Sequence, residues 1–387
     1  MIEDDVYRAS SQYRYWSYTK ESLARMREET NKLASQRVKA AFRRVHAANE
    51  SSQNGENHNE GTGNSAGAGA DHVEIETLTV DEELRIVEWG CSKIMDMGEA
   101  MNPRIPSHVV ATAIQYLRRF YLTNSPMTYH PKQIMMCALY LATKADHFYI
   151  SLSRFVAELN NVSEDDVKAP EFLLLQGLRF TLDVRHPMKG LQGGHVEMNV
   201  LAEEGRLGSS ITKASGSEKR VGVAADNAKK LLATAAQMTD AYFLYTPSQI
   251  WLAAIMIADR ELVEAYISAK LEALPLMAND SDATTEHFRQ KLMATIASCA
   301  TLLESYRSSE DDAAQRKEMR RIGKKLTVCQ NPEKMDIVAV ARAKVAAKRE
   351  GAEGTDAEKA LKKRKLERER LERDGDVFGP ELRDVKG

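Results

Sequence analysis

One short motif occurs twice in this chain, and an unbroken apolar run follows each copy. The motif Tyr-x-Pro-x-Gln-Ile begins at Tyr129 and again at Tyr245, 116 positions later. The runs are 134–142 (IMMCALYLA) and 250–258 (IWLAAIMIA). Proline is tolerated at the first position of a helix, and Ala, Met and Leu favour helix over strand. A helix without a polar face must be covered on all sides. We therefore predict two helical units, each built around one fully buried helix.

A second pair of matching segments lies upstream of these runs. Residues 111–115 read ATAIQ and residues 233–237 read ATAAQ. The connection from this motif to the next is six residues longer in the first copy, a difference that costs little closure entropy. No segment shows the sustained alternation of apolar and polar residues that is typical of strands. The predicted fold class is all-α, a tandem pair of five-helix repeats with extra N- and C-terminal helices.

The repeats occupy the middle of the chain. We expect the first at 79–184 and the second at 185–310, with a loop insertion at 205–222. In the first repeat, helices are expected at 81–97, from Ser107, from Pro131, from Ser151 to Asn160, and from Pro170.

The remaining segments flank or interrupt the repeats. Residues 1–46 are predicted to form an aromatic arm and a helix that Thr19 caps. Residues 47–78, rich in Gly, Asn and Ser, are predicted to be a disordered insertion and linker. Charged C-terminal helices are expected at 311–350, and a disordered tail at 351–387. The N-terminal helix has few apolar residues, so we expect it to lie on the surface of the repeats and to contact them through one narrow face. Its apolar residues are Leu23, Met26, Leu33 and Val38.

Composition excludes several classes of protein. The formal charge of the 387 residues is −2, so the chain as a whole is no polyanion binder. Its four cysteines lie far apart without C-x-x-C spacing, which indicates reduced thiols in an intracellular protein. No apolar stretch reaches the roughly 17–25 residues of a membrane span, and no signal region opens the chain. We expect no membrane association.

A search for catalytic or metal-binding patterns gives nothing specific. Residues 61–66 (GTGNSA) loosely match a dinucleotide motif, but no strand precedes them to aim backbone amides at a phosphate. There is no phosphate loop, no His/Cys cluster at metal spacing and no nucleophile with an adjacent base. His130, at the start of a buried helix, is expected to pack or cap. We expect no enzyme, no cofactor and no metal.

Four segments resemble the cyclin family, and within it the cyclin H branch, whose members regulate the CDK-activating kinase and belong to TFIIH. These segments are 10–16 (SSQYRYW), 120–131 (FYLTNSPMTYHP), 141–148 (LATKADHF) and 239–250 (TDAYFLYTPSQI). The resemblance covers about 10–44 and 79–349. It implies allosteric activation of a cyclin-dependent kinase, a RING-finger assembly subunit and a nuclear location. It also implies that the two terminal helices, the second at 334–349, pack together on the first repeat.

The resemblance also implies which residues contact the kinase. Lys144 and Glu171 occupy positions where cyclins hydrogen-bond the kinase backbone, and Trp16 lies in the arm beside that face. His147 stands where cyclin H-like sequences usually carry an acidic residue, so one charged contact is altered. Without the resemblance, Lys144 and Glu171 are better explained as charges that complement helix dipoles.

Two alternatives stay open. One is a cyclin C-like subunit of the Mediator kinase. The other is a helical nucleic-acid adaptor like transcription factor IIB, supported only by the basic tail with Lys362, Lys363, Arg364 and Lys365. That run is also explained as a solvated helix face or a nuclear import signal. Because the repeats lack a basic, aromatic-laced stripe, we expect no direct nucleic-acid binding.

Overall fold

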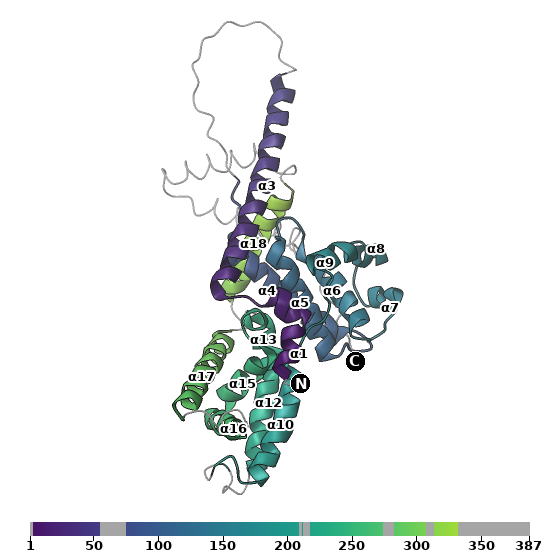
Figure 1. The fold of residues 1–387 in the computed structure, drawn as a ribbon. Coiled ribbons are helices and arrows are strands. Elements are labelled where there is room, and N and C mark those ends of the chain that lie inside the picture. Colours follow the sequence, from purple (N-terminus) through teal and green to yellow (C-terminus); the bar gives the residue numbers. More distant parts are fainter. Residues whose placement is uncertain are drawn as a thin grey trace, which may run out of the picture.

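Every regular element that the structure describes is an α-helix. The computed structural model describes residues 3–54, 75–208, 211, 217–273, 282–306 and 313–331 (Figure 1). The all-α prediction is confirmed. The predicted disordered tail and most of the predicted insertion lie outside the described residues, as do the basic run 362–365 and the segment 334–349.

The first repeat begins at a capping box, in which Thr79 and Glu82 exchange hydrogen bonds. Its helices are α4 (Val80–Ala100), α5 (Ser107–Thr123), α6 (Pro131–Ala145), α7 (Leu152–Ala157), α8 (Glu164–Lys168) and α9 (Glu171–Gly177). The helix expected at 151–160 ends at Ala157, and the unpredicted short helix α8 follows it. Ser163 caps α8 through a second capping box with Asp166.

The second repeat lies below the first in Figure 1. Its helices are α10 (Pro187–Glu203), α12 (Ser217–Ala233), α13 (Ala235–Met238), α14 (Ala241–Leu244), α15 (Pro247–Ala258), α16 (Arg260–Glu272) and α17 (Asp282–Ser305). The loop expected at 205–222 is shorter, because α12 already begins at Ser217. Arg220 fixes this first turn by binding Asp259 at 2.8 Å and Glu261 at 2.9 Å.

The two predicted central helices, α6 and α15, are buried as expected. In α15 every residue from Ile250 to Met256 is at most 8% exposed, and most of the α6 run is equally covered. The indole of Trp251 packs directly on α10, where a Cβ atom added to Gly194 would lie 2.5 Å from its ring. Glycine at this position therefore allows α10 and α15 to approach closely.

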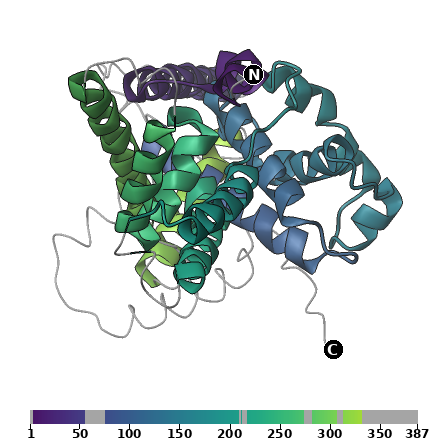
Figure 2. The same ribbon diagram turned by 60° about the horizontal axis from the view of Figure 1, so that its bottom comes forward.

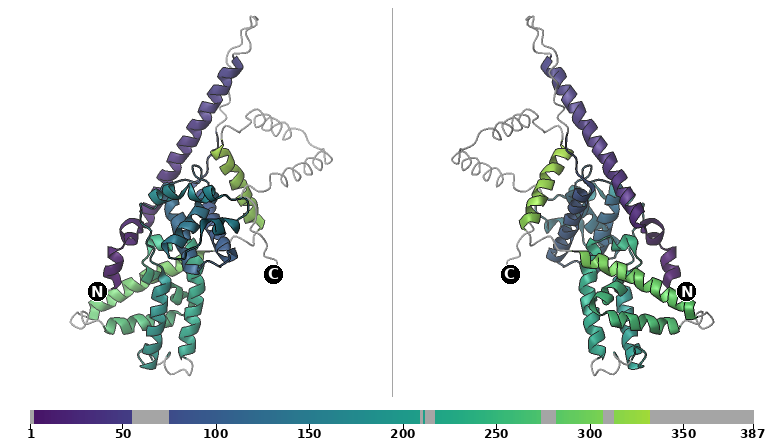
Figure 3. Two further views of the ribbon diagram at one scale, coloured as in Figure 1. Left: turned by 90° about the vertical axis from the view of Figure 1, so that its right-hand side faces the viewer. Right: turned by 90° about the vertical axis from the view of Figure 1, so that its left-hand side faces the viewer.

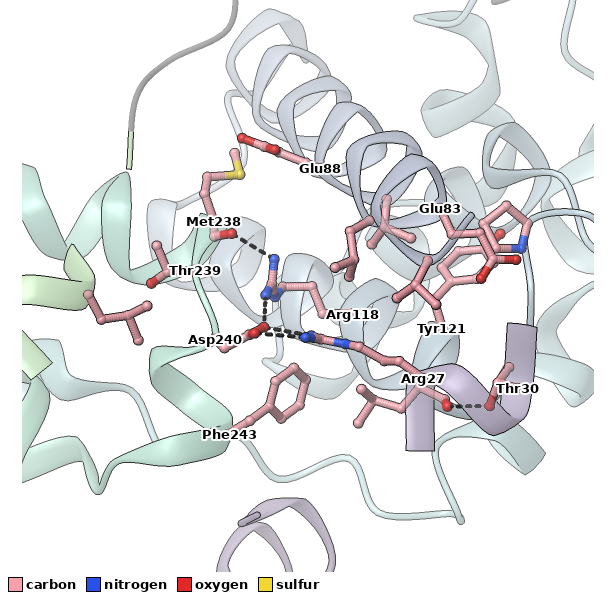
Figure 4. Close-up of a pocket in the computed structure, with 16 residues that line it drawn as sticks. Arg27, Thr30, Glu83, Glu88, Arg118, Tyr121, Met238, Thr239, Asp240 and Phe243 are labelled. Carbon is pink, nitrogen blue, oxygen red and sulfur yellow. Dashed lines mark hydrogen bonds and ion pairs between the residues drawn. The ribbon is translucent and has the colours of Figure 1, made fainter. Parts of the chain in front are cut away.

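Polar side chains join the two repeats. Gln115 on α5 donates to Gln237 on α13 at 3.0 Å, so the glutamines of the two ATAxQ motifs meet at the interface. Arg118 donates to Asp240 at 2.7 Å, and Arg27 of the N-terminal helix reaches the same carboxylate (Figure 4). The second ATAxQ motif does not lie within one helix, because the helical conformation is interrupted at Thr234, between α12 and α13.

The N-terminal segment contains α1 (Glu3–Ala9), α2 (Ser11–Trp16) and α3 (Lys20–Asn54). The last helix was expected to end near His46 but continues to Asn54, since neither glycine nor proline occurs before Gly55. It projects beyond the repeats in Figures 1 and 3. Leu23 and Val38 are buried as predicted, whereas Leu33 is 56% exposed.

The C-terminal helix α18 (Ala313–Gln330) packs on α4, and α3 contacts α4 and α5 (Figures 2 and 3). Both terminal helices contribute to one apolar cluster around Ile86: Ala34, Val38, Phe42, Ile322, Leu326 and Cys329. Glu82 of α4 binds Arg321 and, at 2.9 Å, Lys325. Helices α3 and α18 thus both pack on the first repeat. The packing expected of the helix at 334–349 stays a prediction, because that segment lies outside the described residues.

Candidate functional site

Lys144 and Glu171, which the sequence singles out 27 positions apart, form an ion pair. Lys144 lies in the last turn of α6, and Glu171 is the first residue of α9. The ammonium of Lys144 also lies 5.1 Å from the ring centroid of Tyr140. The two side chains are 39% and 26% exposed, so the pair is held at the surface and accessible to a partner.

His147 extends this face beyond the end of α6. Its φ of 59° puts it in the left-handed region, directly after the C-cap residue Asp146. Its Nδ1 lies 3.1 Å from the hydroxyl of Tyr149, a residue that is 79% exposed. The backbone thus turns sharply here and presents an imidazole and a phenol to the solvent.

Two exposed aromatic residues lie next to Glu171 in α9 and in the turn after it, and the sequence analysis missed them. Phe172 and Phe180 are each 63% exposed, and their ring centroids are 6.2 Å apart. Phe172 directly follows Glu171, while Arg179 and Phe180 both adopt positive φ in the turn after α9. Phenylalanine in an apolar segment is usually buried in the core, so the exposure of these two side chains can be recognised only from the fold. A charged pair beside exposed aromatic rings is typical of a protein-binding surface.

Trp16 does not belong to the exposed surface. Its side chain is 1% exposed, and its Nε1 donates to Thr181 at 2.8 Å. The guanidinium groups of Arg119 and Arg179 lie 5.1 and 5.3 Å from its ring centroid. The covered indole leaves no exposed face for direct contact with a partner. Through Thr181, Trp16 anchors the arm next to the turn that carries Phe180.

Gln12 gives the arm a second anchor. Its Oε1 accepts from the backbone N–H of Arg185 at 2.8 Å and from Arg119 at 3.1 Å. Tyr13 and Tyr15, on the same short helix α2, are 43% and 45% exposed. The arm is therefore fixed by its buried side chains and presents two tyrosines to the solvent.

The described residues form no candidate metal site. Among them, no three His, Cys, Asp or Glu residues come together as metal ligands. His130 caps α6 by accepting from the N–H of Lys132 at 3.1 Å, as expected, and burial lowers its pKa to about 4. No described helix is both long and apolar enough to cross a membrane.

Comparison with known proteins identifies the family. Residues 86–183 match the cyclin N-terminal domain, and residues 186–304 match the cyclin C-terminal domain. The chain belongs to the cyclin family. Among curated relatives of this cyclin, Cyclin CCL1 of Saccharomyces cerevisiae is 35% identical over 272 residues, 69% of this chain and 62% of the yeast protein. Cyclin-H of Xenopus laevis is 32% identical over 192 residues, 47% of this chain and 54% of the frog protein.

Solved structures agree with this assignment. A chain of the CAK complex of Chaetomium thermophilum, bound to ATP-γ-S, is 30% identical and superimposes with a TM-score of 0.68. That match covers 92% of this cyclin and 99% of the other chain. A chain of the yeast TFIIK complex of Kin28, Ccl1 and Tfb3 is 29% identical, with a TM-score of 0.54 over 76% of this cyclin and 99% of that chain.

Proposed function

We propose that this cyclin is the regulatory subunit of a CDK-activating kinase. It would bind a cyclin-dependent kinase and switch it on in TFIIH-linked transcription and cell-cycle control. The observation that carries this proposal is the accessible Lys144–Glu171 ion pair beside the exposed rings of Phe172 and Phe180. The named relatives and matched complexes support the choice of the cyclin H branch over a cyclin C-like subunit.

The proposed mechanism is stabilisation of one kinase conformation. Kinase catalysis needs an ion pair between a strand lysine and a glutamate on a mobile helix. A partner that binds the paired state more tightly shifts the equilibrium between the two kinase conformations towards that state. A difference in affinity of about 10⁴-fold moves the ratio of paired to unpaired kinase from 1:99 to 99:1. The ion pair holds Lys144 and Glu171 in place before binding, which reduces the entropy lost when they contact the kinase.

The partners and the location follow from the same proposal. We infer a RING-finger assembly subunit, because the matched yeast complex contains Tfb3 beside Kin28 and Ccl1. Membership of TFIIH implies a nuclear location, and the run 362–365 would serve as the import signal. We expect the chain to supply no catalytic group of its own and to contact no nucleic acid.

The proposal is tested with purified Kin28, the kinase of the matched yeast complex, as the probe. The affinity for Kin28 and the rate of peptide phosphorylation are measured for the wild type and for Lys144→Ala. We expect Lys144→Ala to weaken binding about tenfold or more. Lys270→Ala is the matched control, because Lys270 forms a comparable surface pair with Glu197 on the second repeat. Equal affinities of Lys144→Ala and wild type would refute this face.

A further inference from the structure

A continuous series of hydrogen bonds connects the end of α6 with the second repeat. Thr112 Oγ1 lies 2.6 Å from Asp146 Oδ2 and 2.9 Å from His186 Nε2. His186 Nδ1 lies 3.0 Å from the hydroxyl of Tyr242, which lies 2.8 Å from Gln237 Nε2. We call these five residues the His186 network. They come from α5, the end of α6, the linker between the repeats, α13 and α14.

The hydrogen bonds of this network are consistent with only one assignment of donors and acceptors. The Thr112 hydroxyl has a single proton, and its nearest acceptor is the Asp146 carboxylate. Its oxygen must then accept from His186 Nε2–H, which leaves Nδ1 to accept from the Tyr242 hydroxyl. The Tyr242 oxygen in turn accepts from the amide of Gln237. This order requires a neutral imidazole with its proton on Nε2.

The surroundings of the imidazole keep it neutral. Burial lowers the pKa of His186 to about 3, and the charges of Arg119, His108 and Lys189 act in the same direction. Thr112 and Tyr242 are 1% and 3% exposed, so water does not replace a lost partner easily. Leaving one such buried group without a partner costs about 1–3 kcal/mol.

The network ends at the kinase-facing turn. Asp146 is the C-cap residue of α6, two residues after Lys144 and directly before His147. Its backbone N–H donates to the carbonyl of Ala142, while its carboxylate is held by Thr112. A shift of the network therefore moves the residue that closes α6 and begins the turn.

We propose that the His186 network positions the turn at residues 144–147 relative to the second repeat, with His186 as its central positioning residue. This inference rests on the proposed kinase-binding function. The second repeat then influences kinase affinity without touching the ion pair, because Tyr242 on α14 and Thr112 on α5 hold the imidazole from opposite sides.

The test compares variants at the two ends of the network. Thr112→Val and Tyr242→Phe each remove one hydroxyl, and Thr112→Ser keeps it. Tyr266→Phe is the matched control, since Tyr266 is another buried tyrosine of the second repeat, whose hydroxyl donates to Glu197 at 2.6 Å. Affinity for Kin28 is measured at a temperature at which thermal unfolding shows every variant to be folded.

We expect Thr112→Val and Tyr242→Phe each to weaken Kin28 binding about three- to tenfold, and Tyr266→Phe and Thr112→Ser to leave it unchanged. The double variant of Thr112→Val and Tyr242→Phe should lose little more than either single one, because both break the same network.

Wild-type affinity in Tyr242→Phe and Thr112→Val, or fully additive losses in the double variant, would overturn the inference while leaving the proposed function intact. A wild-type protein that does not bind Kin28 would overturn both.

Discussion

At the scale of single residues, the Lys144–Glu171 pair contributes little to folding. Its side chains are 39% and 26% exposed, and an ion pair in such a setting is worth at most about 1 kcal/mol. Its more important property is geometric, since it holds two charged groups of known sign at fixed positions on the surface. Folding and binding should therefore respond very differently when the two charges are exchanged.

Exchanging the charges tests this separation. In the variant Lys144→Glu combined with Glu171→Lys, the ion pair can form again with reversed polarity, so the midpoint of thermal unfolding should stay within about 3 °C of the wild type. Kin28 binding should fall about a hundredfold or more, because both charges now oppose those of the kinase backbone groups that they meet. Normal kinase activation by this variant would show that the pair does not face the kinase.

Buried His186 makes stability depend on pH. Below pH 6.5 the unfolded chain binds a proton at this imidazole, whereas the folded chain, with a pKa of about 3, does not. Stability should therefore fall as the pH falls from about 6.5 towards 3. At pH 5.5 the loss from this one group should be about 1 kcal/mol relative to pH 7.5.

Urea unfolding of the wild type and of His186→Gln at both pH values measures this loss as a difference. His130 and all other titratable groups are present in both proteins, so their contributions to the pH dependence cancel in the difference. An identical pH dependence of the two proteins would contradict the neutral state of His186.

At the scale of elements, the N-terminal arm depends on a few buried side chains. Helices α1 and α2 are only seven and six residues long, too short to be stable alone in water. Trp16 and Gln12 connect them to Thr181, Arg119 and the linker between the repeats. The arm should thus detach as a unit when its main anchor is removed.

Trp16→Ala should release the arm without unfolding the repeats. Trypsin should then cut at Arg8 or Arg14 at least tenfold faster than in the wild type, because local opening exposes these sites. Tyr15→Ala is the control, since Tyr15 is 45% exposed and buries far less surface. Kin28 activation should also decrease, because the arm no longer lies next to the turn that carries Phe180. Equal cleavage of both variants would mean that Trp16 does not anchor the arm.

At the scale of the whole molecule, Asp240 joins three parts of the chain. Its carboxylate binds Arg118 of the first repeat and Arg27 of α3, while Asp240 itself belongs to the second repeat (Figure 4). The two arginines hold the pKa of this carboxyl below its usual value despite its burial. One charged side chain therefore contributes to the placement of both repeats and of the N-terminal helix.

Asp240→Asn should destabilise the protein by about 3 kcal/mol, because Arg118, which is 8% exposed, loses the charge that compensates it. Urea unfolding measures the loss. Asp183→Asn provides the control, as Asp183 pairs with Arg185 at a site where both side chains are about half exposed. Losses of equal size in the two variants would show that the buried junction has no special role.

The sequence predicted the features that depend on local pattern. The apolar runs of α6 and α15 and their N-terminal prolines were enough to place the two buried helices. The position of Lys144 in a last turn and of Glu171 in a first turn also follows from the sequence. That these two residues meet depends on how α6 packs against α9, which no local pattern contains.

Other features could not be predicted because they depend on the tertiary structure or because the local sequence gives no clear signal. Phe172 and Phe180 are residue types that usually lie in a core, yet both are 63% exposed, Phe172 on the outer side of α9 and Phe180 in the positive-φ turn after it. The end of α3 was missed because polar residues after His46 suggested disorder, although none of them prevents a helix before Gly55. His186 has an ordinary sequence context, and its importance comes from contacts with residues 56 and 74 positions away.

The contact between Gln115 and Gln237 joins equivalent positions of the two repeats, so it can be compared with a symmetric contact. Contacts between equivalent positions of two similar units are isologous, and a two-fold axis would generate two identical amide bonds there. Only one is present: Gln115 donates to Gln237, but the amide of Gln237 turns to Tyr242 instead. Gln115 Oε1 has no hydrogen-bond donor among the described residues. The two equivalent glutamines thus make different hydrogen bonds, because the Tyr242 hydroxyl takes the amide of Gln237.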